Sequence, residues 1–251
     1  MAMLTKFLLF ALLALLTGPV VAAMSGMAKL GGDWRTANRD SAGMAPDPAG
    51  HREALVQVYG ARAFGWRGAF AVHTWIAVKR RDAEDYMVYQ VIGWRYWHGQ
   101  NPLAQRRDRH PDRNWFGAEP EIYMERRGQA AEALIDKIEA AVAAYPYQDV
   151  YRTWPGPNSN TFTAYVARAV PELRLDLPPT AIGKDYLGET TFADSTPSGT
   201  GYQVSLFGAL GLLAGIEEGI EINLLGLTLG IDPLDLALKL PGIGRLAPDP
   251  G

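Results

Sequence analysis

The sequence predicts an α+β fold in which an antiparallel meander sheet packs on helices. Three apolar runs rich in β-branched and aromatic residues occupy positions 55–59, 69–78 and 86–94. Short segments separate these runs, and short connections favour antiparallel neighbours in a sheet. Two helical segments follow, and a glycine-rich apolar stretch comes last. Strands grouped ahead of helices are typical of an α+β domain.

The composition excludes several classes of function. The chain has 251 residues, of which 48% are hydrophobic, so it can bury a sizeable core. A net charge of -3 provides no basic field for nucleic acid, which is not expected as a partner. The absence of cysteine excludes disulfides and thiolate catalysis. Four scattered histidines and the lack of a phosphate-binding motif predict neither a metal nor another cofactor.

The amino terminus has the pattern of an export signal. Lys6 precedes an apolar run at residues 7–16, and a Gly-Pro pair and small residues follow. Small residues at 21–23 suit cleavage by a signal peptidase, whereas residues 7–28 are also about long enough to cross a bilayer uncleaved. Residues 1–28 are therefore predicted to be either a signal peptide or a membrane anchor. In both cases the domain lies in the cell envelope outside the cytoplasm, either periplasmic or anchored to the inner membrane.

Three further segments follow the amino-terminal one. Residues 29–50 are rich in Gly, Pro and small polar residues and are predicted to be an extended linker. Residues 51–194 contain the predicted strands and helices and form the α+β domain. Residues 195–251 are predicted to form a glycine-rich β-hairpin, because apolar residues occupy the even positions from 202 to 206. The hairpin turns at Glu217, Glu218 and Gly219, and these glutamates argue against a membrane-spanning segment here.

The predicted domain contains one charged loop and two helices. The loop covers residues 105–113, where arginines alternate with aspartates. Apolar residues recur at helical spacing between 129 and 144, which indicates an amphipathic helix. A second helix is predicted from Asn160 to Ala169, because Pro171 ends it.

Ser159 lies at the entrance of the second helix, after a turn-rich segment. A serine there can cap the helix, or it can react with the support of the helix dipole. His73 is the histidine that lies within a β-like run. A strand histidine that faces this serine supplies the parts for nucleophilic catalysis, since the imidazole can accept the hydroxyl proton.

Four further residues complete the candidate site. Asn158 and Asn160 flank the serine and are candidates to donate to an oxyanion, although asparagines in this context also serve as turn residues. Tyr89 and Gln90, on the next predicted strand, are the two candidates to orient His73. Neither is a carboxylate, so an aspartate of the triad type is absent.

The strand His-Thr-Trp-Ile-Ala-Val at 73–78 and the helix start Asn-Ser-Asn-Thr-Phe at 158–162 together resemble the circularly permuted papain-like fold. That fold includes NlpC/P60, lecithin:retinol acyltransferase-like and PPPDE proteins. The resemblance implies that His73 is the catalytic histidine and that Ser159 occupies the place of the nucleophilic cysteine. A hydroxyl is several pH units less acidic than a thiol, so Ser159 depends wholly on its base.

Across most of its length the chain also resembles a proteobacterial family, domain of unknown function 3750. The similar stretches are residues 32–37, 91–95, 154–162 and 177–186. This resemblance implies placement in the cell envelope and implies no activity.

The residues and the resemblances together lead to one hypothesis and two alternatives. The hypothesis is a serine hydrolase or acyltransferase that acts on an amide or ester through Ser159 and His73. Its ligand is a peptide, peptidoglycan or a lipid, and the amino-terminal segment holds it at the membrane. The first alternative is a catalytically inactive papain-like binding module. The second is a membrane-associated structural or interaction protein that uses the apolar hairpin.

Overall fold

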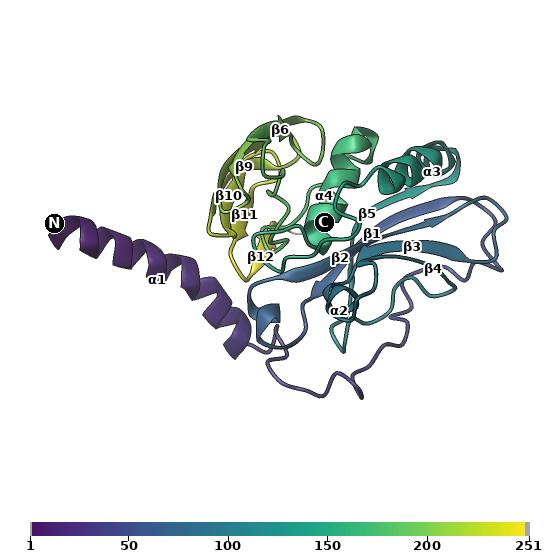
Figure 1. Cartoon of the computed structure of the whole chain (residues 1–251), viewed down its shortest axis with the longest axis horizontal. Coiled ribbons are helices and arrows are strands. Elements are labelled where there is room, and N and C mark those ends of the chain that lie inside the picture. Colours follow the sequence, from purple (N-terminus) through teal and green to yellow (C-terminus); the bar gives the residue numbers. More distant parts are fainter. Residues whose placement is uncertain (1, 249–251) are drawn as a thin grey trace.

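A five-stranded antiparallel sheet forms the centre of the α+β domain (Figure 1). A computed structural model describes residues 2–248 of the chain. Strands β1 to β4 pair in sequence order, which confirms the meander, and β5 adds to the free side of β1. The strands are β1 (Leu55–Arg62), β2 (Val72–Lys79), β3 (Tyr86–Val91), β4 (Leu103–Asp108) and β5 (Glu121–Arg127).

Two of these strands have no counterpart in the prediction. Strand β4 covers the first part of the segment that was expected to be a charged loop, and it pairs with β3 along its whole length. β4 is an edge strand, and its exposed central residues, Gln105, Arg106 and Arg107, are polar and show no apolar alternation. Strand β5 is only partly buried, and its sequence also lacks a clear alternation of apolar and polar residues.

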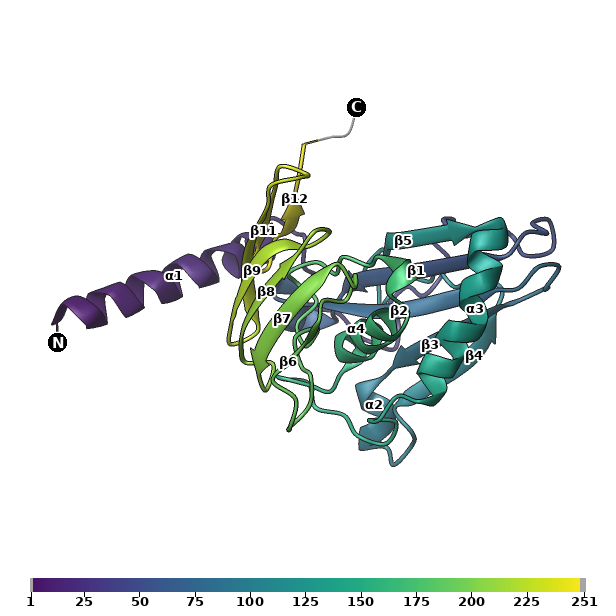
Figure 2. The same ribbon diagram turned by 90° about the horizontal axis from the view of Figure 1, so that it is seen from above.

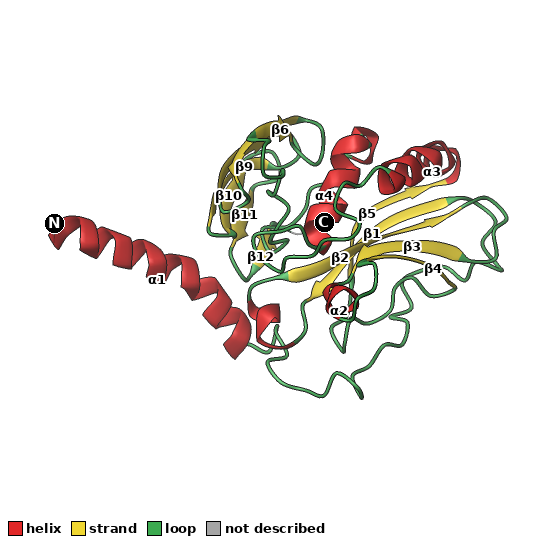
Figure 3. Ribbon diagram, viewed as in Figure 1, coloured by secondary structure: helices red, strands yellow, loops and turns green. Residues whose placement is uncertain are grey.

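Helices α3 (Gly128–Ala143) and α4 (Ser159–Ala169) cover one face of this sheet (Figure 3). Their apolar faces and the facing side chains of β1, β2 and β3 form the main hydrophobic core. Both helices begin and end within a residue of the predicted bounds. The shorter helices are α2 (Gly93–Trp97), η1 (Gly65–Ala69) and η2 (Pro171–Leu173).

The segment 29–50 lies against the opposite face of the sheet. It contains no helix or strand, and a single bridge joins Ser41 to Arg113. The buried carboxylate of Asp112 holds it in place by accepting hydrogen bonds from the Ser41 hydroxyl at 2.8 Å and the Met44 amide at 2.6 Å. Ala45 packs into a second, smaller hydrophobic cluster on this face.

The carboxy-terminal apolar region forms a second antiparallel sheet of seven strands. The turn predicted at residues 217–219 lies between β8 and β9, but each long predicted strand is divided in two. Leu225 and Gly226 both adopt positive φ, 56° and 86°, which makes a two-residue hairpin between β9 and β10. The strands are β6 (Ala193–Ser195), β7 (Gly201–Leu206), β8 (Leu210–Gly215), β9 (Gly219–Leu224), β10 (Leu227–Asp232), β11 (Ala237–Leu240) and β12 (Gly244–Leu246).

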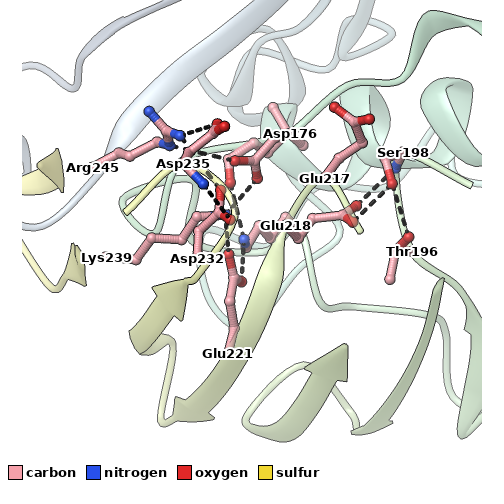
Figure 4. A network of polar contacts seen from close by, with 12 residues as sticks. Asp176, Thr196, Ser198, Glu217, Glu218, Glu221, Asp232, Asp235, Lys239 and Arg245 are labelled. Carbon is pink, nitrogen blue, oxygen red and sulfur yellow. Dashed lines mark hydrogen bonds and ion pairs between the residues drawn. The ribbon is translucent and has the colours of Figure 1, made fainter. Parts of the chain in front are cut away.

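The inner face of this second sheet is polar and carries a buried ionic network (Figure 4). Glu221 on β9 pairs with Lys184 at 2.5 Å and with Lys239 on β11 at 2.8 Å. Lys239 also pairs with Asp176 at 2.7 Å. The side chains of Glu221, Lys184 and Lys239 are each no more than 2% exposed. The second sheet is therefore attached to the first domain by charges that are removed from water.

Helix α1 (Ala2–Met24) projects from the body on the side of the second sheet (Figures 1 and 2). Its last turns meet the β11–β12 connection at very short range, since a Cβ on Gly18 would lie 1.9 Å from the Pro241 carbonyl oxygen. Among the described residues, no helix combines the length and the apolar content that a membrane crossing needs.

Candidate functional site

The start of helix α4 is capped by Asn158. Its Oδ1 accepts hydrogen bonds from the amides of Asn160 at 2.9 Å and Thr161 at 3.1 Å. Its Nδ2 donates to the carbonyl oxygens of Thr153 at 3.1 Å and Ile182 at 3.0 Å. Both protons and both lone pairs of the amide are therefore occupied. Asn158 has no donor left for an oxyanion, and its role in the structure is that of a cap.

Asn160 ties helix α4 to strand β2. Its Oδ1 accepts a hydrogen bond from the Thr74 hydroxyl at 3.0 Å. Its Nδ2 donates to the carbonyl oxygens of Val72 at 3.0 Å and Ile182 at 2.8 Å. Both amide protons bind backbone acceptors, so the structure assigns Asn160, like Asn158, to holding the fold together.

Ser159 is the first residue of α4 and is 6% exposed. Its carbonyl oxygen lies 3.3 Å from the Thr74 hydroxyl. Its own hydroxyl makes no hydrogen bond with any residue between 2 and 248. Ser159 is therefore not the helix cap, and within the described chain no base is in contact with it.

We expect substitutions at Asn158 and at Ser159 to change the stability of the protein by clearly different amounts. Asn158→Ala removes the cap and the hydrogen bond to the Thr153 carbonyl oxygen, whereas the Ile182 carbonyl keeps its bond from Asn160, so the free energy of unfolding should fall by about 2 kcal/mol. Ser159→Ala should change it by less than about 0.5 kcal/mol, because the hydroxyl has no partner. Urea denaturation followed by circular dichroism measures both values. Equal losses would contradict the assignment of the cap to Asn158.

His73 lies on the face of the sheet away from α4. Its neighbour Thr74 contacts α4, and adjacent residues on a strand point to opposite faces. The imidazole stacks on Trp115, with ring centroids 3.6 Å apart and planes 10° apart. The sheet therefore lies between His73 and Ser159, and the structure does not bring this predicted pair together.

Of the two orienting candidates, Gln90 is the one that contacts His73. The His73 Nε2 lies 3.0 Å from the Gln90 Oε1. Tyr89 points to the other face of the sheet, where its hydroxyl lies 3.5 Å from Glu139. An amide oxygen only accepts, so Nε2 carries the proton and Nδ1 holds the lone pair of a neutral ring. Burial lowers the pKa of His73 to about 4, against the opposing effect of the Gln90 hydrogen bond.

A pocket with aromatic walls opens beside this histidine, on the same face of the sheet. It encloses about 170 Å³ between the sheet, the start of α2 and the segments around residues 39 and 111–116. We call it the aromatic pocket. Its lining consists of Arg39, Trp75, Val88, Gln90, Ile92, Trp94, Arg106, Pro111, Arg113, Asn114, Trp115 and Phe116. Of these residues, Gln90 alone was predicted to belong to a site, because residues between 39 and 116 converge only after folding.

Three guanidinium groups line the aromatic pocket, and the carboxylates of Asp108, Asp112 and Asp40 all act on one of them, that of Arg113. Arg106 and Arg113 both bind the carboxylate of Asp108, at 2.6 Å and 2.9 Å. Burial raises the pKa of Asp108, but the hydrogen bond from Arg113 and the charge of Arg106 outweigh it and lower the pKa. Arg39 adds a third guanidinium above the Phe116 ring. Gln90 contributes its amide, whose Nε2 makes no hydrogen bond within residues 2–248.

Comparison with protein families identifies the domain that carries this pocket. A family model described as "Protein of unknown function (DUF3750)" matches residues 53–186, more than half of the chain. The chain belongs to this family. The DUF3750 segment contains the five-stranded sheet, helices α3 and α4, and every pocket residue except Arg39. The second sheet and α1 lie outside it.

The other comparisons found no relative of this DUF3750 protein. Neither the curated proteins nor the solved structures included a match. A papain-like relationship is therefore not shown by the comparisons. Between residues 2 and 248, no group of three or more His, Asp or Glu side chains is arranged to hold a metal ion.

Proposed function

We propose that this protein is a catalytically inactive ligand-binding module of the bacterial cell envelope, and that the aromatic pocket is its binding site. The observation that carries the proposal is the pocket itself, which combines indole walls, three guanidinium groups and the Nε2 of Gln90, which has no hydrogen-bond partner within residues 2–248. The proposed envelope location rests on the export-like amino terminus. The same segment is proposed to attach the protein to the membrane.

The proposed ligand is an acidic saccharide of the peptidoglycan type. The C–H faces of sugar rings stack on indoles, and guanidinium groups bind carboxylates in pairs of hydrogen bonds. Ligand pockets for drug-sized molecules enclose about 300 Å³ or more. The aromatic pocket, at about 170 Å³, suits a single ring of a longer polymer.

Titration with muramyl dipeptide, which carries a sugar ring and a carboxylate, tests the proposal through tryptophan fluorescence. Trp94→Ala and Arg106→Ala each remove one exposed pocket wall and should weaken binding about tenfold. The matched controls are Trp97→Ala on the same helix and Arg107→Ala on the same strand, because neither residue lines the pocket. Equal effects of the paired substitutions, or no binding at all, would overturn the proposal.

A hydrolase or acyltransferase that uses Ser159 is the second candidate. The unpaired hydroxyl at the amino terminus of α4 supports it, and the position of His73 behind the sheet weighs against it. Labelling with a serine-reactive phosphonate separates the two candidates. We expect no label on the wild-type protein. A label that disappears in both Ser159→Ala and His73→Ala would favour the enzyme.

A further inference from the structure

The second sheet has the reverse of the usual polarity of a surface sheet. In a sheet with one face in water, apolar side chains normally point to the core and polar ones to the solvent. Here alternate residues of β9 point the opposite way, with Glu221 and Asn223 buried and Ile220 and Ile222 about half exposed. The same inversion holds on β7, where Gln203 is buried.

The outer face of this sheet forms a continuous apolar surface. Strand register places Val204 opposite Leu212, Leu212 opposite Ile222, and Ile222 opposite Leu229. A parallel row runs from Ile220 through Ile231 to Leu238 and Leu246. From β7 to β12 the Tyr202 hydroxyl is the one polar side-chain group on this face among the described residues. We call it the apolar face.

The ionic network explains why the sheet does not turn over. Shifting the register by one residue, or turning the sheet, would bury the apolar side chains. Turning the sheet would also carry Glu221 away from Lys184 and Lys239 away from Asp176, and would leave Lys184 and Asp176 without these partners. Unpaired buried charges are strongly unfavourable, so the network holds the apolar face outward. The exposure of this surface is therefore built into the fold.

The apolar face is comparable in size to the largest apolar patches that soluble monomers usually expose. The six strands β7 to β12, each of three to six residues, cover on the order of 500 Å² as a flat area. The side chains make the exposed area larger than this flat area. Typical monomers expose patches of about 300–600 Å². A shallow hollow between Phe192 and the β7–β9 strands lies on the same face and is lined almost entirely by apolar atoms.

Helix α1 extends the apolar surface in one direction. It leaves the body beside β11 and β12 and projects on the side toward which the apolar face points (Figures 1 and 2). Leu9, Leu12 and Leu13 are each about half exposed along it, and Val20 and Val21 continue this pattern near the sheet. The helix and the sheet therefore require the same apolar surroundings.

We propose that the apolar face rests on the hydrocarbon surface of a lipid bilayer, beside α1. Interfaces between proteins carry about one hydrogen bond per 100–200 Å², and this face offers one hydroxyl. Hydrocarbon needs no such partners. A second copy of the chain packed on the apolar face would have to accommodate two projecting α1 helices, whereas lipid can contact each helix separately. The proposal does not depend on the aromatic pocket, which lies in the other domain.

Binding of the full chain to vesicles tests this proposal. The vesicles contain phosphatidylethanolamine and phosphatidylglycerol in a 3:1 ratio, and flotation measures the bound fraction. Leu212→Lys combined with Ile222→Lys places two charges on neighbouring strands of the apolar face and should lower the partition coefficient about tenfold or more. Trp97→Lys, at an exposed site on α2, should leave it unchanged. Circular dichroism verifies that each variant is folded.

A fluorescent probe distinguishes contact by the sheet from attachment by α1 alone. The chain has no cysteine, so Leu212→Cys and Glu84→Cys can each be labelled at one site with a polarity-sensitive dye. On vesicles, the dye at 212 should shift to the blue and be quenched by spin labels on the acyl chains. The dye at 84, in the β2–β3 turn, should do neither. Two results would overturn the proposal: a dye at 212 that stays in water on bound vesicles, or a dimer in solution that the double lysine variant dissociates while vesicle binding persists.

Discussion

Glu221→Gln is expected to lower the free energy of unfolding by about 3–5 kcal/mol, which is the cost of removing one member of a buried ionic group. Glutamine keeps the shape of the side chain but removes the charge that both Lys184 and Lys239 face. Burial raises the pKa of Glu221, but the two ammonium groups outweigh it and lower the pKa, so the carboxylate is charged. Chemical denaturation at neutral pH measures the loss.

A surface pair gives the matched control for this substitution. Glu217 lies in the turn that precedes β9, four residues before Glu221, and pairs with Arg174, and both side chains are partly exposed. Glu217→Gln should cost less than about 1 kcal/mol, because water already screens this pair. Replacing Glu221, Lys184, Lys239 and Asp176 together by apolar residues of similar size should restore most of the stability, because no charge of the network then remains unpaired. Equal effects of Glu221→Gln and Glu217→Gln would contradict the role of the network.

His73 should make the protein less stable as the pH falls from about 6.5 towards 4. Its folded pKa of about 4 lies below the ordinary value of 6.5, so the unfolded chain binds more protons in this range. The contribution is complete above pH 6.5 and is lost on acidification. The expected loss is about 2 kcal/mol at pH 5 and about 3 kcal/mol once both states are protonated.

The difference between the wild type and His73→Gln isolates this contribution. Asp176 titrates in the same range with the opposite sign, because burial raises its pKa to about 6. Both proteins share that effect, so it cancels in the difference. His73→Gln should cost most near pH 7.5, and its cost should shrink by about 2 kcal/mol at pH 5. A cost that does not vary between these pH values would contradict the neutral, buried state of His73.

Local patterns predicted the secondary structure where the hydrophobic periodicity was clear and where short connections or a proline marked the end of an element. The short connections between 55 and 91 indicated the meander, and Pro171 indicated the end of α4. Strand β4 was missed because an edge strand carries exposed arginines in place of an apolar face. The cap was ambiguous because Asn158 and Ser159 are both good capping residues, and only the hydrogen bonds of Asn158 decide between them.

Three properties follow from the sequence itself, because each depends on residues that are close in the chain. They are the family membership, the α+β class and the alternating pattern of the carboxy-terminal strands. Which face each strand turns inward depends on distant partners. The packing of the sheet determines which way His73 points and why Gln90, rather than Tyr89, contacts it. It also brings together the residues that line the aromatic pocket. The alternation of the last strands predicted two unlike faces. Only the ion pairs of Glu221 with Lys184 and of Lys239 with Asp176 determine that the polar face is buried, because a buried charge must lie beside its partners.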